Sequence, residues 1–535
     1  MDSAYDNFIK LAIERFPRTS DFLQLKKQIS GELKLPIPTN ADLREHYEQL
    51  ISQKIIKRNP DFEKILKTRS IRTESGVAVV AVLTKSYPCP GQCLYCPTEK
   101  EMPKSYLSNE PAVMRAIASR FDPYLQVQNR LRSLELNGHE TDKIELIVMG
   151  GTFSYLPKAY QKKFIAECFR ACNEYKVHKV RKVKKLVKSG DLGEKLLKEQ
   201  KKNERAKHRI VGLTLETRPD YIDEKEILNF RELGCTRVEL GVQSIFDDVL
   251  EKNKRGHLVS ETIEATKLLK NAGFKINYHI MPGLPGSNLE RDHEMFEKLF
   301  SDPNFQPDML KIYPTVVVKN SALYNEWKKK KYFPLTNQAF EEFVLKVKNE
   351  IIPPYVRIAR LVRDVPTTSI IAGPTVSNLR QVIAHRSRCR CIRCREVRAN
   401  YKIEEEIIFD RIDYNASGGR EIFLQYVSPD KKKLFALLRL RIPTDKNKDY
   451  FIPTLRDGAL IREVHTYGKL TGIDKIDKAS PQHIGLGKKL IEEAERIVWE
   501  EFRIQKIVII SGIGVRNYYR KLGYKLKDTY LVKNL

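Results

Sequence analysis

Short runs of β-branched residues alternate with helical segments through the middle of the chain, and this alternation limits the fold more than any other feature. Six such runs are expected as strands, at residues 77–83, 144–149, 210–215, 237–240, 275–279 and 309–313. Strands that alternate with helices form parallel βαβ units. The pattern therefore predicts an α/β partial barrel, with its chemistry at the carboxyl ends of the strands.

Length and charge set further bounds. A chain of 535 residues has room for about three or four domains. Subtracting 68 acidic from 96 basic residues leaves a net charge of +28, which favours a polyanionic partner, nucleic acid above all. No apolar run approaches the roughly 20 residues of a membrane span, and the first ten residues are too polar for a secretion signal. We therefore expect a cytoplasmic protein without a membrane partner.

Composition divides the chain into four regions. Residues 1–75 form a helical, basic N-terminal region, for which a solvated leader and RNA contact are both open. The barrel region, 76–375, contains a basic insertion at 176–209 with 14 Lys and Arg against 4 Asp and Glu; a solvated face and contact with RNA phosphates are again both open. A Cys- and Arg-rich connector at 376–400 precedes a separate α/β domain at 401–535.

Three cysteines, Cys89, Cys93 and Cys96, lie within eight residues directly after the first expected strand. Three thiolates on a 4Fe-4S cluster leave one iron open to a substrate, whereas a closed electron-transfer cluster needs a fourth cysteine. Zinc is the alternative, but a structural zinc site needs four ligands and no neighbour supplies the last. The spacing favours an open cluster.

Polar residues and glycines also gather at the ends of the next strands, and buried strand ends seldom carry such side chains without a ligand. The candidates are Gly150, Gly151, Thr152, Glu216, Arg218, Gln243 and Ser244. An ordinary turn is the alternative for the glycine pair. With the cysteine spacing, these segments resemble the radical S-adenosylmethionine superfamily, which implies that S-adenosylmethionine binds the open iron and that the Gly-Gly turn meets its methionine group.

The last domain contains a glycine turn before a helix with a clear apolar stripe. Gly485 and Gly487 would let backbone N–H groups and the helix N-terminus approach a pyrophosphate. The order of segments resembles the GNAT acetyltransferase fold, in which the turn that starts at Gln482 and His483 binds acetyl-CoA. Tyr518 or Tyr519 is then a candidate catalytic residue, with the other tyrosine packed in the core or exposed. Weaker candidates for cofactor binding follow on one strand: Glu463, Val464 and His465.

The fusion of these two domains through a Cys-rich connector resembles the family of Elongator catalytic subunits, in an archaeal form, over residues 70–535. The resemblance implies tRNA as the substrate, bound through its anticodon arm, and 5-carboxymethyluridine at the wobble position as the product. A deoxyadenosyl radical would abstract hydrogen from the acetyl methyl group of acetyl-CoA, and the carbon radical would add to C5 of uridine. Hydrolysis of the thioester would then release coenzyme A and leave the carboxymethyl group. A homodimer or accessory subunits are also expected as partners.

Further residues take their expected roles from the same resemblance. Cys389, Cys391 and Cys394 resemble the zinc-binding connector of the family, with His385 or a residue from elsewhere as the fourth ligand; a free-thiol loop is the alternative. Lys252 is a candidate catalytic residue that would line the path of the RNA or the acetyl group, and an exposed basic helix is the alternative there.

Two other functions remain open from the sequence. One is a protein lysine acetyltransferase in which the iron-sulfur cluster has only a structural role. The other is a tRNA-binding scaffold without catalytic turnover, which would bind with a steep dependence on salt.

Overall fold

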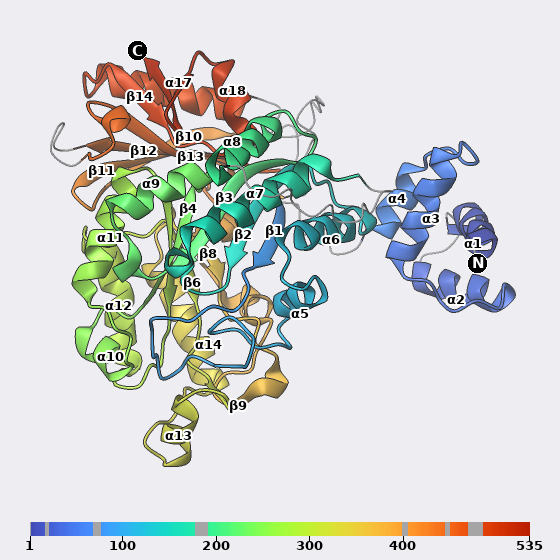
Figure 1. Ribbon diagram of the computed structural model, residues 1–535, viewed down its shortest axis with the longest axis horizontal. Helices are drawn as coiled ribbons and strands as arrows, with labels where there is room; N and C mark the ends of the chain where they lie inside the picture. The colour runs from blue at the N-terminus through green and yellow to red at the C-terminus, as the bar shows by residue number, and fades with distance from the viewer. Residues whose placement is uncertain are drawn as a thin grey trace.

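The computed structural model describes residues 2–16, 21–67, 76–176, 191–398, 405–443, 450–468 and 485–535. Within these ranges the chain forms a helical N-terminal region and two seven-stranded sheets (Figure 1). None of the described helices has both the length and the apolar character that a membrane span requires.

Four helices make up the N-terminal region: α1 (Asp2–Arg15), α2 (Phe22–Glu32), α3 (Asn40–Ser52) and α4 (Pro60–Leu66). They have a core of their own, with Tyr47 and Phe62 fully buried at its centre. The region stands to one side of the main body, next to α6 (Pro123–Leu136), as Figure 1 shows. Glu45 of α3 forms an ion pair with Arg132 of α6 at 2.5 Å, which ties the two together.

The first sheet is parallel throughout and its strands follow in chain order, with one helix or more between most neighbours. Its strands are β1 (Ala78–Leu83), β2 (Lys143–Met149), β3 (Arg209–Thr217), β4 (Arg237–Gln243), β5 (Lys275–Ile280), β6 (Met309–Ile312) and β8 (Arg357–Arg360). The covering helices include α5 (Pro111–Ala118), α7 (Lys158–Glu174), α8 (Leu192–Asn203), α9 (Glu224–Leu233), α10 (Asp247–Lys252), α11 (Val259–Asn271), α12 (Leu289–Ser301) and α14 (Asn337–Lys346). The six predicted strands are confirmed.

The seventh strand, β8, was not expected from the sequence. It carries two arginines in four residues and comes shortly after a pair of prolines, features more typical of a loop. The strand forms because Arg357 pairs with Glu396 at 2.8 Å, so its charge is compensated in the interior. The connector that contains Glu396 thus packs on the last barrel strand.

The second sheet has the order β10-β11-β12-β13-β14-β16-β15. Its strands are β10 (Ile408–Ala416), β11 (Gly419–Val427), β12 (Leu434–Pro443), β13 (Ala459–Thr466), β14 (Lys506–Ile509), β15 (Lys525–Lys527) and β16 (Tyr530–Asn534). All neighbours are antiparallel except β13 and β14, which run parallel and pair only from Ala459 to Ile461. Helix α17 (Leu486–Glu500) packs on this sheet with its apolar stripe buried.

The two sheets meet across a layer of buried charges. Asp308, just before β6, and Glu421 of β11 are both completely buried. Arg462 of β13 binds both carboxylates, at 2.5 Å and 3.1 Å, and Arg441 of β12 binds Glu421 at 2.9 Å. Lys270 of α11 lies 3.6 Å from Asp308 and 3.9 Å from Glu421. The second sheet therefore packs on the amino ends of the barrel strands and leaves their carboxyl ends free.

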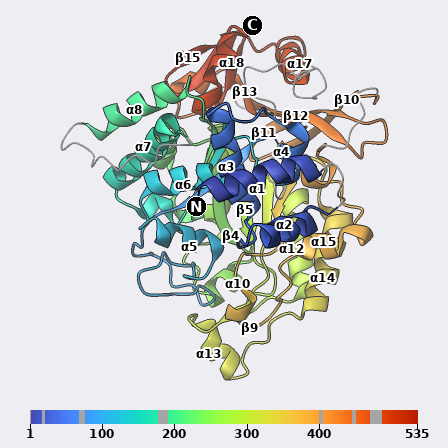
Figure 2. The same ribbon diagram turned by 90° about the vertical axis from the view of Figure 1, so that its right-hand side faces the viewer.

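Close backbone contacts reinforce this junction. The short turn η10 (Ile513–Val515) lies on β3, and a Cβ added to Gly512 would be only 2.0 Å from the carbonyl oxygen of Val211. Beyond it, Arg520 of α18 (Arg516–Arg520) binds Glu204, which follows α8, at 2.6 Å. Both views place the second sheet at the end of the molecule opposite α13 (Leu323–Lys328) (Figures 1 and 2).

Candidate active site and metal centre

Cys89, Cys93 and Cys96 lie on the loop that follows β1, at the carboxyl end of the parallel sheet. The loop is held by backbone hydrogen bonds, from Cys96 N–H to the Cys93 carbonyl and from Leu94 N–H to the Asn253 carbonyl. Among the described residues, the three sulfurs do not form a group with all members within 4.8 Å of one another. They are therefore spaced more widely than the connector cysteines described below.

Two buried arginines face this loop. Arg255 donates from Nη1 to the sulfur of Cys93 at 3.5 Å. Nη1 of Arg218 lies so close to Gly91 that an added Cβ would be 2.4 Å away. Among the described residues that nitrogen has no hydrogen-bond partner, although Asp220 binds the other side of the guanidinium. A buried cation with a free donor beside three thiols suits an anionic group.

The glycine pair lies at the end of β2, in backbone conformations that favour glycine. Gly150 has φ +136° and Gly151 has φ +91°. A Cβ on Gly150 would lie 2.0 Å from the hydroxyl oxygen of Thr84, at the end of β1. That hydroxyl is buried and has no partner among the described residues. Thr152 follows as the residue before a short 3-10 turn. The structure thus places an unpaired hydroxyl and a bare backbone beside the cysteine loop.

Charged side chains line the inner face of the sheet toward the same end. Glu239 of β4 accepts a hydrogen bond from His279 Nε2 at 2.9 Å and forms an ion pair with Lys311 of β6. Glu216 of β3 accepts from the Tyr106 hydroxyl at 2.7 Å. Burial alone would raise the pKa of Glu239, but Lys311 and the His279 hydrogen bond hold that pKa well below its usual value.

The end of β4 carries the other predicted contacts. Gln243 adopts a left-handed conformation, with φ +71°, and its Oε1 is buried without a partner among the described residues. Ser244 is buried, and its hydroxyl accepts from Phe246 N–H at 3.3 Å. Lys252 is exposed at the end of α10 and its side chain covers Gly286. A catalytic role for Lys252 stays a prediction.

A second cluster of candidates surrounds the N-terminus of α17. Gly485 has φ +77° and is the N-cap, and Gly487 lies in the first turn. A Cβ on Gly487 would lie 3.5 Å from the Tyr518 hydroxyl and 3.9 Å from Val464 Cγ1. Tyr518 is 42% exposed whereas Tyr519 is 7% exposed, so of the two tyrosines only Tyr518 is open to solvent. Gln482 and His483, the remaining predicted residues of this turn, lie outside the described residues.

The other two candidates on β13 lie away from that turn. Glu463 binds Lys275 at 3.0 Å and Arg439 at 2.9 Å, so its carboxylate belongs to the junction between the sheets. The ring of His465 packs against Tyr467, with 4.3 Å between ring centroids. Their roles in cofactor binding stay predictions, and the structure gives Glu463 a structural role.

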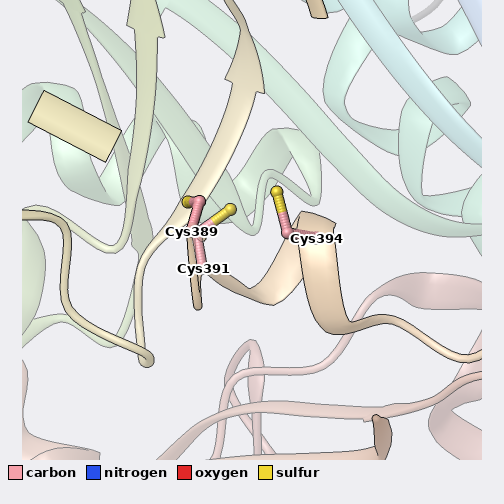
Figure 3. A group of neighbouring side chains, drawn as sticks. All are labelled: Cys389, Cys391 and Cys394. Carbon is pink, nitrogen blue, oxygen red and sulfur yellow. The ribbon is translucent and has the colours of Figure 1, made fainter. Parts of the chain in front are cut away.

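The connector cysteines do form a compact group. The sulfurs of Cys389, Cys391 and Cys394 all lie within 4.8 Å of one another. Figure 3 shows Cys389 and Cys391 on an extended segment and Cys394 in helix α16 (Ile392–Arg395). Hydrogen bonds from the other two thiols lower the pKa of Cys391 well below its usual value. His385 is exposed on a neighbouring turn and is not part of this group, so its role as fourth ligand stays a prediction.

Several residues of the barrel site were missed by reasoning from the sequence. Arg255 falls in a segment that reads as an exposed basic helix, but it is 6% exposed and points at Cys93. Lys311 is the single charged residue of a short apolar strand, and such a residue in the sequence indicates a buried partner for its charge. Arg363 binds Glu110 at 3.2 Å and covers the Tyr106 ring, and nothing local in the sequence indicates this.

Comparison with known proteins places these features in a family. Residues 83–299 match the radical SAM superfamily, and residues 307–388 match a radical SAM C-terminal domain. The chain is 46% identical to the tRNA uridine(34) acetyltransferase of Methanocaldococcus infernus, over 88% of each chain. It is 39% identical to the human Elongator complex protein 3, over 89% of this chain and 88% of the relative.

A solved structure agrees with this. The archaeal Methanocaldococcus infernus Elp3 with an N-terminal deletion is 42% identical, covers 86% of this chain and 100% of its own, and has a TM-score of 0.71. The chain therefore belongs to the family of the tRNA uridine(34) acetyltransferases and Elongator complex protein 3.

Proposed function

We propose that this protein is an enzyme that carboxymethylates the wobble uridine of tRNA, with acetyl-CoA as the carbon source and radical S-adenosylmethionine chemistry as the means. The names of its relatives support the substrate, and the match to the radical SAM superfamily supports the chemistry. The observation that carries the proposal is the loop of Cys89, Cys93 and Cys96 at the carboxyl end of the barrel, faced by the buried arginines Arg218 and Arg255.

The barrel residues fit a 4Fe-4S cluster with bound S-adenosylmethionine, which would supply a carbon-centred radical when reduced. Cys89, Cys93 and Cys96 would hold three irons. Arg255 would offset the negative charge of the thiolates, since its guanidinium already contacts Cys93. The turn at Gly150 and Gly151 would present backbone groups to the methionine group, with the unpaired Thr84 hydroxyl beside them.

The second sheet fits the acetyl-CoA domain of a GNAT fold. Strands β13 and β14 pair only as far as Ile461, and β13 then continues to Thr466 paired with β12 alone. The N-terminus of α17 lies beside this opening, because Gly487 is close to both Thr466 and Val464. Free N–H groups at a helix N-terminus suit a pyrophosphate. The Tyr518 hydroxyl, above Gly487, is the group we assign to protonate the departing thiolate.

The connector fits a zinc ion. Cys389, Cys391 and Cys394 supply three closely spaced thiols, and a fourth ligand would complete the tetrahedron. The segment after them joins the sheets, since Ile392 N–H donates to the Val356 carbonyl and Val397 N–H donates to the Leu434 carbonyl. A bound ion would therefore fix the join between the barrel and the second sheet.

The test is anaerobic reconstitution with iron, sulfide, reductant, S-adenosylmethionine, acetyl-CoA and transcribed tRNA, followed by nucleoside mass spectrometry. We expect 5-carboxymethyluridine with the wild-type protein and with Cys172→Ala, which alters a buried thiol in α7 away from the loop. Cys93→Ser should abolish the product. Peptide acetylation that survives Cys93→Ser, without any modified uridine, would instead favour a protein lysine acetyltransferase.

A further inference from the structure

A run of four lysines, Lys328 to Lys331, begins at the last residue of helix α13, at the far end of the barrel. All four are exposed, and none forms an ion pair with a carboxylate in the described part of the chain. Lys330 takes a left-handed conformation, with φ +56°, where glycine would be free of strain. Four uncompensated cations in one turn repel one another, so the arrangement is unfavourable for folding alone.

Aromatic rings flank the lysines. Phe333 is 75% exposed, more than any other large apolar side chain among the described residues. Tyr324 and Trp327 stack on each other within α13, with 5.8 Å between ring centroids, and Lys328 lies over the Tyr324 ring. Exposed aromatic rings between cations are typical of surfaces that bind single-stranded nucleic acid, because bases stack on the rings while the cations meet phosphates.

This segment, which we name the α13 finger (residues 321–335), is anchored beside the cysteine loop. Leu323 N–H donates to the Leu94 carbonyl at 2.8 Å, so α13 begins against the residue that follows Cys93. Leu323 and Tyr332 are buried, and the Tyr95 ring packs against them. The Tyr332 hydroxyl donates to the Gly283 carbonyl at 2.7 Å. The finger therefore holds its lysines in a fixed place at the mouth of the barrel.

We propose that the α13 finger binds the substrate RNA beside the cysteine loop, with Lys328 to Lys331 on the phosphates and Phe333 stacked on an unpaired base. The inference rests on the proposed function, because it assigns the finger to the same RNA. Both views show α13 projecting from the end of the molecule opposite the second sheet (Figures 1 and 2). The RNA would thus approach the free carboxyl ends of the barrel strands.

An anionic membrane surface is the other ligand that lysines around an exposed phenylalanine could meet. The observations favour RNA. The finger is anchored on the loop of the proposed catalytic site, and a membrane would cover the mouth through which that site is reached. Membrane binding is nevertheless a distinct outcome of the experiment.

The experiment compares the full-length protein with Lys329→Ala/Lys330→Ala and with Phe333→Ala. Binding of transcribed tRNA, and of its isolated anticodon stem-loop, is measured by fluorescence anisotropy over a range of salt. The matched control is Lys525→Ala/Lys527→Ala, which removes two exposed lysines from β15 on the second sheet. Circular dichroism and thermal midpoints check that all variants fold, as expected for exposed side chains.

The double lysine variant should bind both RNAs more weakly, and its slope of log affinity against log salt should fall by about 0.7–0.9 for each lysine. Phe333→Ala should weaken binding of both by about 5- to 150-fold without changing that slope. The control should bind as the wild type does. Unchanged affinity and slope in the finger variants would overturn the inference.

The same variants are also tested for sedimentation with vesicles of phosphatidylcholine and phosphatidylglycerol. Loss of sedimentation with unchanged tRNA affinity would overturn the inference in favour of a membrane surface. The proposed function fails separately, if the reconstituted wild type makes no modified uridine. In that case, finger-dependent RNA binding would still support the RNA surface.

Discussion

Lys270 at the junction of the two sheets offers a quantitative test of how the domains are held together. Its ammonium group is completely buried and has no hydrogen-bond partner among the described residues, although Asp308 and Glu421 lie within 4 Å. Arg462 and Arg441 already bind those carboxylates, so Lys270 adds a surplus cation. Burial, opposed by the two carboxylates, lowers the pKa of Lys270 from 10.5 to about 8.

The free energy follows from this fall in pKa. At 1.36 kcal/mol for each pH unit, keeping the buried ammonium charged costs about 3 kcal/mol. The native protein releases the proton near pH 8, whereas the unfolded chain keeps it up to pH 10.5. Because the unfolded state binds more protons between these values, the contribution of Lys270 to stability rises with pH over this window and is lowest below pH 8.

Lys270→Met should therefore raise the free energy of unfolding at pH 7 by roughly 1–3 kcal/mol, since it removes a buried surplus charge and leaves both carboxylates paired. Equilibrium urea unfolding at several pH values measures the effect. The advantage over the wild type should shrink as pH rises from 8 to 10.5. Lys225→Met, at an exposed position on α9, should change stability by less than about 0.5 kcal/mol.

Two results would refute this reasoning. A loss of about 3 kcal/mol in Lys270→Met at pH 7 would mean that the lysine is an essential partner of the carboxylates. A difference from the wild type that stays constant between pH 8 and 10.5 would mean that Lys270 is not the group that titrates.

Three further predictions concern the sites. Gly150→Ala should abolish S-adenosylmethionine cleavage, because its Cβ would collide with Thr84. Gly31→Ala, at a position in α2 with open space around it, should not. The amount of 5′-deoxyadenosine formed measures cleavage in both variants. Tyr518→Phe should slow acetyl-CoA hydrolysis by about 10²-fold with coenzyme affinity nearly unchanged, and loss of affinity alone would contradict an acid role. Cys391→Ser should lose zinc but keep iron in elemental analysis, and a full complement of zinc would remove the connector site.

The sequence predicted the barrel better than it predicted the junction. Strand runs and cysteine spacing are local patterns, so the loop of Cys89 and the turn at Gly150 were found in advance. Strand β12, in contrast, alternates leucine with Arg439 and Arg441, a pattern that reads as a strand with one face in water. Both arginines are in fact 1% exposed, because that face packs on the barrel.

The reason is the distance along the chain between the partners. Arg441 binds Asn271, which is 170 residues away, and Arg462 binds Asp308, which is 154 residues away. Periodicity reports that a strand has two faces, but it does not say whether water or another domain covers the polar one. The role of Arg255 has no local signal for the same reason, since its partner Cys93 lies 162 residues earlier.

The contact of Gly512 with Val211 leaves no space for even a methyl group between the barrel and the second sheet. This junction also contains buried guanidinium and carboxylate groups. It therefore cannot act as a hinge without breaking their ion pairs. If acetyl-CoA binds at α17, a substrate must then cover the distance to the cysteine loop, because the two domains do not move toward each other. Either the pantetheine arm of the coenzyme would extend toward the cysteine loop, or the RNA would move between the two sites.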